Sequence, residues 1–452
     1  MIEVGFATND ITPRVGVELT GFGPFLNRHS VGVRDPLSAK AMALASHGRR
    51  ALIISCDLAM VTADITRKVR ALLHAACGLT EDEVMLCATH THSCPAVGDW
   101  EGWGVVDLPY LETLPQRIAR AGIKAVEALQ EATFAHAEVP CEHIGLNREY
   151  DRDAQPLEDV LQNDWRPALP QLTDTTCHVL TARTPGGTLI GFVSYFGCHP
   201  VVCSASNRHF HGDFVSIANN AVERDNDGAV GLFLQGAEGD VNSCVVHKPE
   251  EESLRALDVI ADRFAVAVRS GIADAQPFEA DRLQVCRRVP AFSRKRWSKD
   301  ELRQSLRDCE AKLSLPDPER PGAEDDPDIR LQVVYATTLR KLLARMERGE
   351  NLEPGMELHG LRIGPVAILG SPFETFQAIK NDVCAAASAP IPLVVSLVNE
   401  SCGYAPDRTC AERGGYATDM VPMIHGTLPF VNVHEELVRE LLALDAQLSG
   451  QE

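Results

Sequence analysis

The sequence predicts an α/β fold. Short apolar runs bounded by turn residues, such as 51–56 and 84–87, are typical of buried strands. They alternate with segments of helical periodicity at 62–76 and 107–130, a pattern that indicates a sheet covered by helices. In addition, polar side chains follow several apolar runs at the point where a strand gives way to a loop. The 452 residues suffice for one large domain with insertions, and we expect a single domain.

Turn residues and periodicity assign most of the remaining chain. Residues 1–60 are expected to form paired strands and turns, because glycine and proline punctuate short apolar runs there. Further strands are expected at 176–182, 189–196, 230–234 and 393–398, helices at 249–275 and 434–448, and another α/β unit at 361–387.

Residues 298–350 differ in character from the rest of the chain. They are charged and helix-forming, and prolines and a glycine interrupt them between 316 and 322. This pattern predicts a helical hairpin inserted in the main domain. Such a hairpin serves either as a lid over a site or as a contact in a homo-oligomer, and the sequence leaves both open.

Composition and charge exclude some classes of partner. The formal net charge of −20 argues against nucleic acid or an anionic membrane as the main partner. The first residues do not resemble a signal peptide, and no apolar run approaches the ~20 residues that span a bilayer. The 14 cysteines are scattered without a regular framework, which favours reduced thiols. We therefore expect a cytoplasmic protein with a small-molecule substrate and no membrane or nucleic-acid partner.

Two histidines follow the apolar run at 83–87, in the motif Thr-His-Thr-His-Ser. Side chains at i and i+2 of a strand share a face, so His90 and His92 are expected to point into one crevice at the strand's carboxyl end. Two imidazoles in a crevice indicate a metal site or an acid–base pair. Two structural histidines are the alternative.

Three more expected strand ends carry polar groups. His199 stands in Gly-Cys-His-Pro, Asn242 ends a loop of small residues, and Glu400 follows the apolar run at 393–398. Two histidines and a carboxylate are a common set of catalytic zinc ligands and leave room for a water molecule. The residues therefore predict a metal-dependent hydrolase.

Two loops contain candidate substrate-binding residues. Glycines in Gly21-Phe22-Gly23 permit a close approach of backbone to ligand, although a plain turn explains them equally well. Arg148 can clamp a carbonyl or carboxylate with its planar guanidinium, whereas a surface position is the more common fate of an arginine.

The order of these motifs resembles the catalytic domain of the neutral/alkaline (non-lysosomal) ceramidases and their shorter bacterial relatives. The resemblance runs from residue 5 to about 420 and implies mixed β-sheet layers flanked by helices. The similar segments are 10–13, 35–37, 55–57, 89–93, 147–148, 197–200, 235–242 and 399–416.

The resemblance also implies roles for individual residues. One zinc ion per chain would be held by His90, His199, Glu400 and a tyrosine, for which Tyr416 matches best and Tyr404 is the alternative. The chemistry implied is hydrolysis of an amide by a metal-activated water.

Other residues would assist that reaction. His92 would hydrogen-bond the substrate carbonyl or the oxyanion, while Arg148 and the loop from Gly21 to Gly23 would line the pocket, with Tyr404 as a further substrate contact. Glu374, in a Pro-x-Glu element, is expected to cap a helix or to support Glu400.

Two departures from the family bear on the substrate. Ceramidases carry a serine where this chain has Asn242, which leaves a metal-bound water as the nucleophile and Asn242 as a donor. The chain ends at residue 452, so the C-terminal β-rich domain of the ceramidases is not expected. A small soluble N-acyl compound therefore fits better than a membrane sphingolipid.

Two alternatives to an amidohydrolase remain. The same metal site could open an ester or lactone, or act as a lyase or isomerase on a sugar-like substrate. The second alternative is a binding protein without catalysis that holds a metal.

Overall fold

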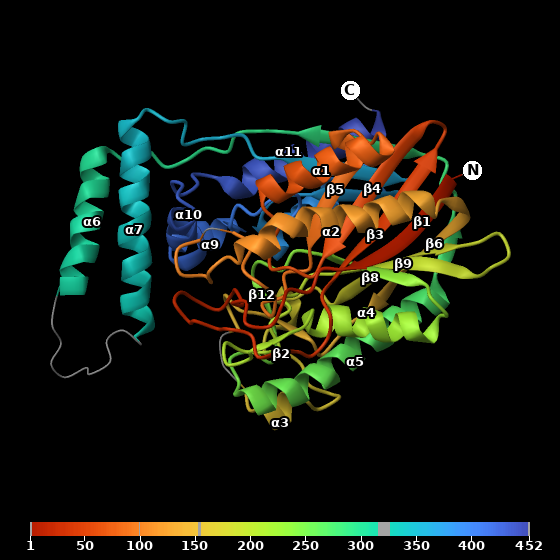
Figure 1. Cartoon of the computed structure of the whole chain (residues 1–452), viewed down its shortest axis with the longest axis horizontal. Helices are drawn as coiled ribbons and strands as arrows, with labels where there is room; N and C mark the ends of the chain where they lie inside the picture. Colours follow the sequence, from red (N-terminus) through yellow and green to blue (C-terminus); the bar gives the residue numbers. More distant parts are fainter. Residues whose placement is uncertain (1, 99, 152–154, 315–325, 451–452) are drawn as a thin grey trace.

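Two β-sheets form the centre of the molecule. The computed structural model describes residues 2–98, 100–151, 155–314 and 326–450. A nine-stranded sheet and a four-stranded sheet lie against each other (Figure 1). Across the large sheet the order is β11 (Val230–Gln235), β9 (Leu189–Phe196), β8 (Thr176–Arg183), β6 (Gln130–Pro140), β1 (Ile2–Asp10), β3 (Ser38–Ser46), β4 (Arg49–Cys56) and β5 (Val84–Ala88), and β13 (Gln276–Phe278) pairs with β6.

The large sheet is mixed. β5 pairs with β4, and β11 with β9, in parallel, whereas the pairs through β1, β3, β6 and β8 are antiparallel. Each parallel pair is joined through a helix, α1 (Ala63–Cys77) in one case and α4 (Asp213–Asp225) in the other. A parallel pair needs such a crossover, because the chain must return to the same edge before the next strand begins.

Helices cover one face of the large sheet. Leu52 and Ile54 of β4 point toward α1 and α2 (Leu108–Glu127), where they pack on Val69 and Ile118. At the other end of the sheet Phe192 of β9 packs on α4 and on α5 (Glu250–Asp274). Successive strand residues face opposite sides, and both sides are apolar, so the sheet is buried on both faces.

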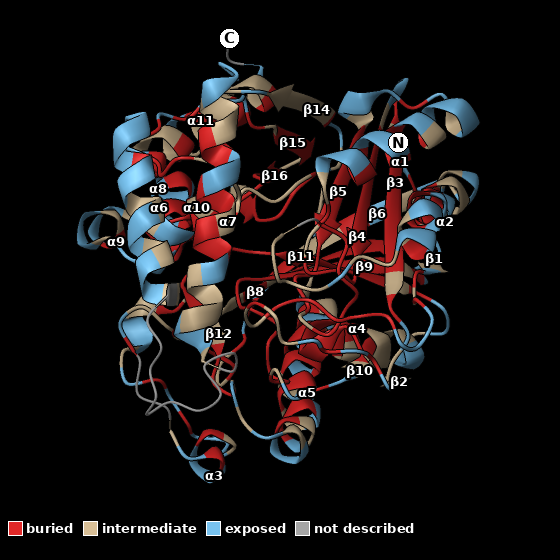
Figure 2. Ribbon diagram, turned by 60° about the vertical axis from the view of Figure 1, so that its left-hand side comes forward, coloured by how far each residue is buried: buried red, intermediate tan, exposed pale blue. Residues whose placement is uncertain are grey.

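The small sheet covers the other face. Its strands are β14 (Leu283–Arg288), β15 (Leu358–Ile363), β16 (Val366–Gly370) and β18 (Ile391–Val395). Ile53 and Met85 of the large sheet meet Ile368 and Val395 of the small one. The far side of the small sheet packs on α8 (Gln377–Ala386) and α11 (Val433–Ser449), which gives the order helix, sheet, sheet, helix (Figure 2). The predicted α/β fold with mixed sheet layers is confirmed.

Two helices lie where the sequence predicts a helical hairpin. α6 (Lys299–Ser314) and α7 (Pro327–Glu347) pack on each other at one end of the molecule (Figure 1). The predicted break at 316–322 lies outside the described residues. Val334 and Tyr335 of α7 pack against the short helix α10 (Val421–Ile424), so the hairpin is attached beside the segment that follows Tyr416.

One strand is shorter than predicted. The apolar run at 393–398 ends as a strand at Val395, because Leu397 and Asn399 have positive φ angles of 56° and 64°. This turn determines where the next residue, Glu400, lies.

Among the described helices, none has both the length and the apolar character needed to cross a bilayer.

Candidate metal centre

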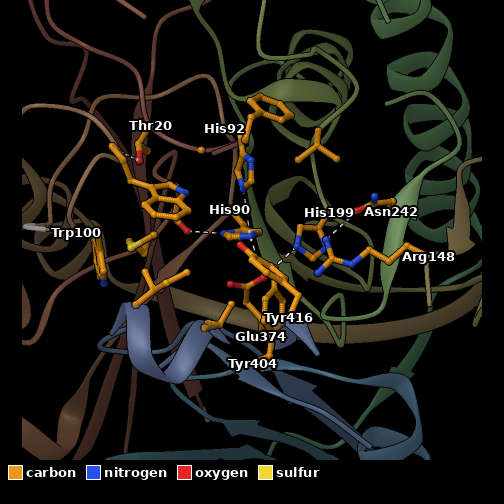
Figure 3. Close-up of a pocket in the computed structure, with 18 of the residues that line it drawn as sticks. Thr20, His90, His92, Trp100, Arg148, His199, Asn242, Glu374, Tyr404 and Tyr416 are labelled. Atoms are coloured by element: carbon orange, nitrogen blue, oxygen red, sulfur yellow. Dashed lines mark hydrogen bonds and ion pairs between the residues drawn. The ribbon is translucent and has the colours of Figure 1, made fainter. Parts of the chain in front are cut away.

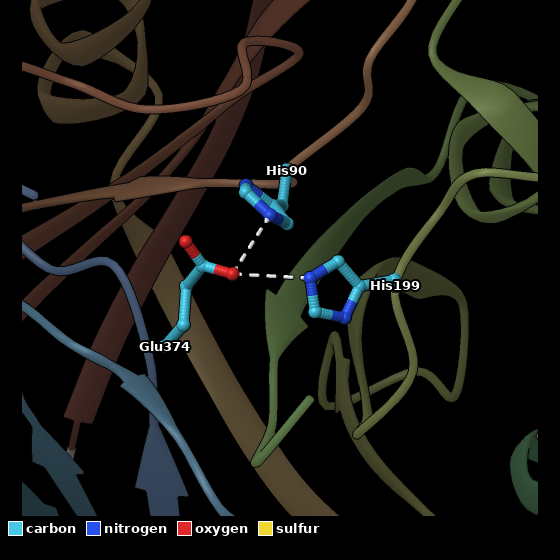
Figure 4. Close-up of side chains that lie close together, drawn as sticks. All are labelled: His90, His199 and Glu374. Atoms are coloured by element: carbon cyan, nitrogen blue, oxygen red, sulfur yellow. Dashed lines mark hydrogen bonds and ion pairs between the residues drawn. The ribbon is translucent and has the colours of Figure 1, made fainter. Parts of the chain in front are cut away.

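Two histidines and a glutamate converge in a buried cluster. Nε2 of His199 lies 3.0 Å and Nε2 of His90 lies 3.4 Å from the same oxygen, Oε2 of Glu374 (Figure 4). The three potential ligand atoms all lie within 4.8 Å of one another. All three residues are buried, so the cluster lies inside the protein and not on its surface.

Both imidazole rings are held from behind by backbone carbonyls. Nδ1 of His90 lies 2.6 Å from the carbonyl oxygen of Ala59, and Nδ1 of His199 lies 2.7 Å from that of Glu238. A carbonyl only accepts hydrogen bonds, so each Nδ1 carries the proton and donates it. In the neutral form each ring then has its lone pair on Nε2, which faces Glu374, the arrangement that metal-binding histidines adopt.

This arrangement fits a metal cation. Burial, together with the nearby charge of Arg148, lowers the pKa of His199 to about 4, so the ring is neutral at pH 7. A neutral ring with its proton on Nδ1 has only a lone pair to present to the carboxylate oxygen 3.0 Å away. Such acceptors converge without a donor between them, and a cation between them is the species that satisfies all three.

The carboxylate stays ionised in this position. Burial by itself would raise the pKa of Glu374, but the neighbouring imidazoles of His90 and His199 hold it well below the usual range. Glu374 therefore offers an anionic oxygen beside the two imidazole rings.

His90 lies just beyond a strand end, in a strained conformation. β5 ends at Ala88, and His90 has a positive φ of 71°, a value that few residues other than glycine adopt. Its backbone N–H donates to the carbonyl of Leu58, 2.9 Å away, which helps hold the turn. His90 and His92 line the same cavity, with ring centroids 4.8 Å apart, although neither belongs to the strand from which their shared face is predicted.

Glu374, and not Glu400, occupies the place of the predicted carboxylate ligand. Glu374 begins the short strand β17 (Glu374–Thr375), which pairs in parallel with β19 (Tyr404–Ala405). The cap of α8 is Phe376, so Glu374 does not cap that helix. The backbone of Gly239 lies close to this strand, and a Cβ at Gly239 would lie only 2.5 Å from the carbonyl oxygen of Glu374.

Glu400 lies elsewhere. It interacts with the thiol of Cys402, 3.3 Å away, and it does not line the cavity. The preceding residue, Asn399, is a structural residue: its side chain accepts from the N–H of Leu86 and donates to Glu357. The left-handed turn at Asn399 thus fixes the loop on the strands and leaves Glu400 outside the cluster.

The cluster forms part of a cavity of about 290 Å³. One side is polar and the other is mainly apolar and aromatic (Figure 3). The polar lining consists of Thr20, His90, His92, Arg148, His199, Asn242, His247, Glu374, Tyr404, Tyr416 and His425, and the remaining lining of Gly21, Phe22, Ala59, Met60, Trp100, Trp103, Val201, Val246, Val421 and Ile424.

His92 is held between His90 and the glycine loop. Its Nε2 lies 3.4 Å from Nε2 of His90, and its Nδ1 has no hydrogen-bond partner among the described residues. Burial and the neighbouring His90 lower its pKa well below the usual range, so the ring is neutral. Gly21 has a φ of 95°, and a Cβ there would lie 2.5 Å from Cγ of His92. Gly21 and Phe22 line the cavity as predicted, whereas Gly23 does not.

Arg148 and Asn242 are brought together by a short strand pair. β7 (Gly145–Asn147) pairs with β12 (Val241–Ser243), and Asn242 also bridges to His199. The guanidinium of Arg148 donates to Oδ1 of Asn242 at 3.3 Å and to the carbonyl of Gly239 at 2.8 Å. It also lies over the ring of Tyr404, 5.1 Å from the centroid.

Arg148 keeps its charge although it is buried. Burial alone would lower its pKa, but the phenol of Tyr404 and the carboxylate of Glu374 raise it above the usual value. Within the described ranges Arg148 has no ion-pair partner, so its charge is available to a bound molecule.

Comparison with known proteins identifies the family of this chain. The family model for the N-terminal part of the neutral/alkaline non-lysosomal ceramidases matches residues 2–253. The chain belongs to this ceramidase family. The match includes His90, His92, Arg148, His199 and Asn242, whereas Glu374 and both tyrosines lie beyond it.

Curated ceramidases match about half of the chain. Neutral ceramidase A of Dictyostelium discoideum is 25% identical over 260 residues, which make up 53% of this chain and 35% of that protein. Neutral ceramidase of Pseudomonas aeruginosa is 26% identical over 260 residues, 54% of this chain and 37% of that protein. The match thus spans only about a third of each relative's length.

Solved ceramidase structures share the fold along the whole chain. The crystal structure of neutral ceramidase from Pseudomonas aeruginosa matches with a TM-score of 0.74 at 19% identity, covering 99% of this chain and 75% of that one. A ceramidase complexed with C2 matches with a TM-score of 0.73 at 18% identity, covering all of this chain and 75% of that one. The ceramidase fold therefore includes the part of the chain that contains Glu374.

In this ceramidase-family chain both candidate tyrosines line the cavity. Tyr404 is the residue of β19 that pairs directly with Glu374 of β17, and this pairing sets its position. It is almost fully buried. Tyr416 is 47% exposed and begins a π-helical turn, Tyr416–Met420, after two glycines with positive φ. Such turns are rare and frequently occur at functional sites. The structure places both phenols near Glu374, and the choice of a fourth ligand between them stays a prediction.

Several cavity residues of this ceramidase-family chain are not predicted from the sequence. Trp100 donates from its indole to Nδ1 of His425, 3.3 Å away, and Trp103 and His247 also line the cavity. The two tryptophans follow shortly after the histidine motif in the sequence, and this proximity could have indicated that they lie near the histidines. His247 and His425 lie in loops without periodicity and offer no such signal.

Proposed function

We propose that this chain is a zinc-dependent hydrolase that cleaves the amide bond of a small, soluble N-acyl compound. The observation that carries the proposal is the convergence of His90, His199 and Glu374, with each Nδ1 already bonded to a backbone carbonyl. Membership of the ceramidase family supports the reaction, because the curated relatives are neutral ceramidases.

Zinc suits this donor set. Two imidazole nitrogens and a carboxylate are the ligands of many catalytic zinc sites, which keep another position open for water. Tyr416 is our first choice for a fourth protein ligand and Tyr404 our second. A bound zinc ion lowers the pKa of its water to about 7 and polarises an acyl oxygen.

The polar side of the cavity would orient the amide. Neutral His92 can donate one N–H to the substrate carbonyl oxygen, and its position is set by Gly21 behind it. Arg148, which keeps its charge, holds the amide oxygen of Asn242 and so turns the Asn242 N–H₂ group away from itself. Donors fixed in a buried site stabilise developing negative charge without reorganising during the reaction.

The opposite side would hold the acyl group. Met60, Trp100, Trp103, Val421 and Ile424 provide an apolar and aromatic wall. A cavity of about 290 Å³ is at the small end of the range for ligand pockets, which supports a short substrate over a long-chain lipid.

All 14 cysteines are free thiols, which supports the further proposal of a reducing, cytoplasmic location.

Metal analysis tests the proposal first. Purified, untagged wild type should contain one more zinc ion per chain than the variant His90→Ala/His199→Ala. The exposed pair His47→Ala/His74→Ala is the matched control and should keep the wild-type zinc content. A folded double variant that retains all of the wild-type zinc would refute the metal centre.

A substrate screen then tests the reaction. Short N-acyl amides should be cleaved by wild type and not by the double variant. Esters, lactones and sugar-like compounds belong in the same screen, because they represent the alternative chemistry of the site. Metal binding without turnover of any amide would contradict the amidohydrolase and favour the alternatives.

A further inference from the structure

We propose a second site for a divalent metal ion, formed by His136, Glu138 and His178 on the large sheet. Zinc, nickel and copper(II) ions are the class that fits, because imidazole nitrogens prefer them over magnesium or calcium. The site is separate from the candidate metal centre and does not depend on the proposed hydrolase activity.

Strand register brings the three side chains together. β6 and β8, both labelled in Figure 1, are antiparallel neighbours. Glu138 lies opposite His178, and His136 lies opposite Leu180. Directly paired residues share a face, and so do residues two apart on one strand. His136, Glu138 and His178 therefore project from the same face of the sheet.

The distances match those between ligands of one metal ion. Nε2 of His136 lies 3.2 Å from Nδ1 of His178, and Oε1 of Glu138 lies 3.8 Å from the same Nδ1. Two nitrogens at ~2.0–2.1 Å from a tetrahedral zinc ion are themselves about 3.3 Å apart. The two rings are already spaced for one ion, and the exposed Glu138 side chain has the freedom to complete the set.

The site marks the end of the apolar layer between the two sheets. Phe134 and Leu180, on the same face of β6 and β8, belong to that layer. Next to His178, the hydroxyl of Tyr195 reaches across and donates to the carbonyl of Val394 on the small sheet. His178 is 17% exposed in its side chain and Glu138 57%, so an ion can reach the site from solvent.

The charged neighbours do not compete for the site. A cavity of about 310 Å³ adjoins it and is lined by His178, Glu138, Asp174 and Lys380, among others. Asp174 and Lys380 form an ion pair with each other. Glu138 is therefore left to offset the charge of a bound ion. A bound ion would join β6 to β8 at the edge of the layer and stabilise the folded chain in proportion to its occupancy.

Metal titration of stripped, untagged protein tests the site, with Ni²⁺ and Zn²⁺ as probes. Wild type should bind two ions per chain by calorimetry and metal analysis, and His136→Ala/His178→Ala should bind one. The exposed pair His47→Ala/His74→Ala should bind two. The variant His90→Ala/His199→Ala, which lacks the candidate metal centre, should still bind one ion. Adding His136→Ala/His178→Ala to that variant should abolish the remaining binding. Mg²⁺ should not occupy the site.

These variants separate the second site from the proposed hydrolase. If His90→Ala/His199→Ala still binds one ion and the addition of His136→Ala/His178→Ala removes that ion, the second site stands whatever the first variant does to hydrolysis. If it binds none, or if folded His136→Ala/His178→Ala binds as many ions as wild type, the rings form only a hydrogen bond and the second site is refuted. Should His136→Ala/His178→Ala fail to fold, Glu138→Gln replaces it in the test. Introduced into His90→Ala/His199→Ala, Glu138→Gln must weaken the binding of the remaining ion at least about tenfold, and an unchanged affinity refutes the second site.

Discussion

Nε2 of His199 faces Oε2 of Glu374 across 3.0 Å, while Nδ1 of the same ring lies 2.7 Å from the carbonyl of Glu238. A neutral imidazole has one N–H, and the backbone carbonyl takes it. The remaining contact is between a lone pair and a carboxylate, which is unfavourable unless a cation lies between them. This contact identifies Glu374 as the carboxylate of the candidate metal centre.

Glu374→Gln should therefore remove both zinc and activity. The amide lacks the negative charge that offsets the cation, and we expect kcat/KM to fall roughly a hundredfold or more. Glu400→Gln is the matched control, because Glu400 lies outside the cavity beside Cys402. Zinc content and hydrolysis rates of both variants check the prediction. Loss of zinc in Glu400→Gln with zinc retained in Glu374→Gln would reverse the assignment.

Gly21→Ala should impair catalysis without removing the metal. A Cβ at this position would lie 2.5 Å from Cγ of His92, so the ring must move away from the position in which we propose that it meets the substrate. Gly16 has nearly the same φ, 97° against 95°, with no atom within 4 Å of the added Cβ. Both variants should lose about 1–2 kcal/mol of stability from the backbone alone.

Kinetics and zinc analysis separate these effects. Only Gly21→Ala should lower kcat/KM, and both variants should bind zinc as the wild type does. Equal losses of kcat/KM in the two variants would show that the glycine loop acts through stability and not through His92.

The sequence predicts most of this site because the fold follows from local patterns. Apolar runs and helical periodicity place β5 and β9 next to their crossover helices, and the polar residues after those strands include His90, His92 and His199. The pairings across the large sheet make β5 and β9 run in opposite directions, so a shared carboxyl edge does not bring these residues together. β11, the parallel neighbour of β9, contacts β3, β4 and β5, and this contact between distant parts of the sheet lets residues far apart in the chain enter one cavity.

The candidate carboxylate ligand is not predictable in the same way. Glu374 and Glu400 both follow apolar strands, and sequence patterns do not distinguish them. The difference comes from the left-handed turn at Asn399 and from the two-residue pairing of β17 with β19. Both features depend on contacts between distant segments, which carry no local periodicity.

Arg148→Lys should lower activity while the metal stays bound. Lysine keeps the charge, but a single ammonium group cannot donate to Asn242 and Gly239 in the same planar geometry and also lie over the ring of Tyr404. We expect kcat/KM to fall about ten- to a hundredfold. Arg269→Lys, in an exposed ion pair with Asp225, is the control and should have no effect.

A double-mutant cycle tests whether Arg148 acts through Asn242. The effects of Arg148→Lys and Asn242→Ala on kcat/KM should be non-additive, because the two side chains share a hydrogen bond. Additive effects would mean that Arg148 contacts the substrate independently of Asn242.

Stability should fall as the pH is lowered, in part because of His359. This buried ring donates from Nε2 to the carbonyl of Asp82 and accepts at Nδ1 from the amide of Asn399, so both nitrogens are used in the neutral form. Burial, with the nearby charge of Arg70, lowers its pKa to about 4. The unfolded chain, with an ordinary histidine pKa near 6.5, therefore takes up the proton first as the pH falls.

The contribution of His359 to the free energy of unfolding is thus complete above about pH 6.5 and is lost progressively as the pH falls toward about 4. In this window one such group changes the free energy by up to about 1.4 kcal/mol per pH unit. Urea denaturation of metal-stripped protein between about pH 7.5 and about pH 5 should show a smaller slope for His359→Gln than for wild type. His47→Gln, on the surface, should keep the wild-type slope. A wild-type slope in folded His359→Gln would mean that the ring takes up its proton without opposing the fold.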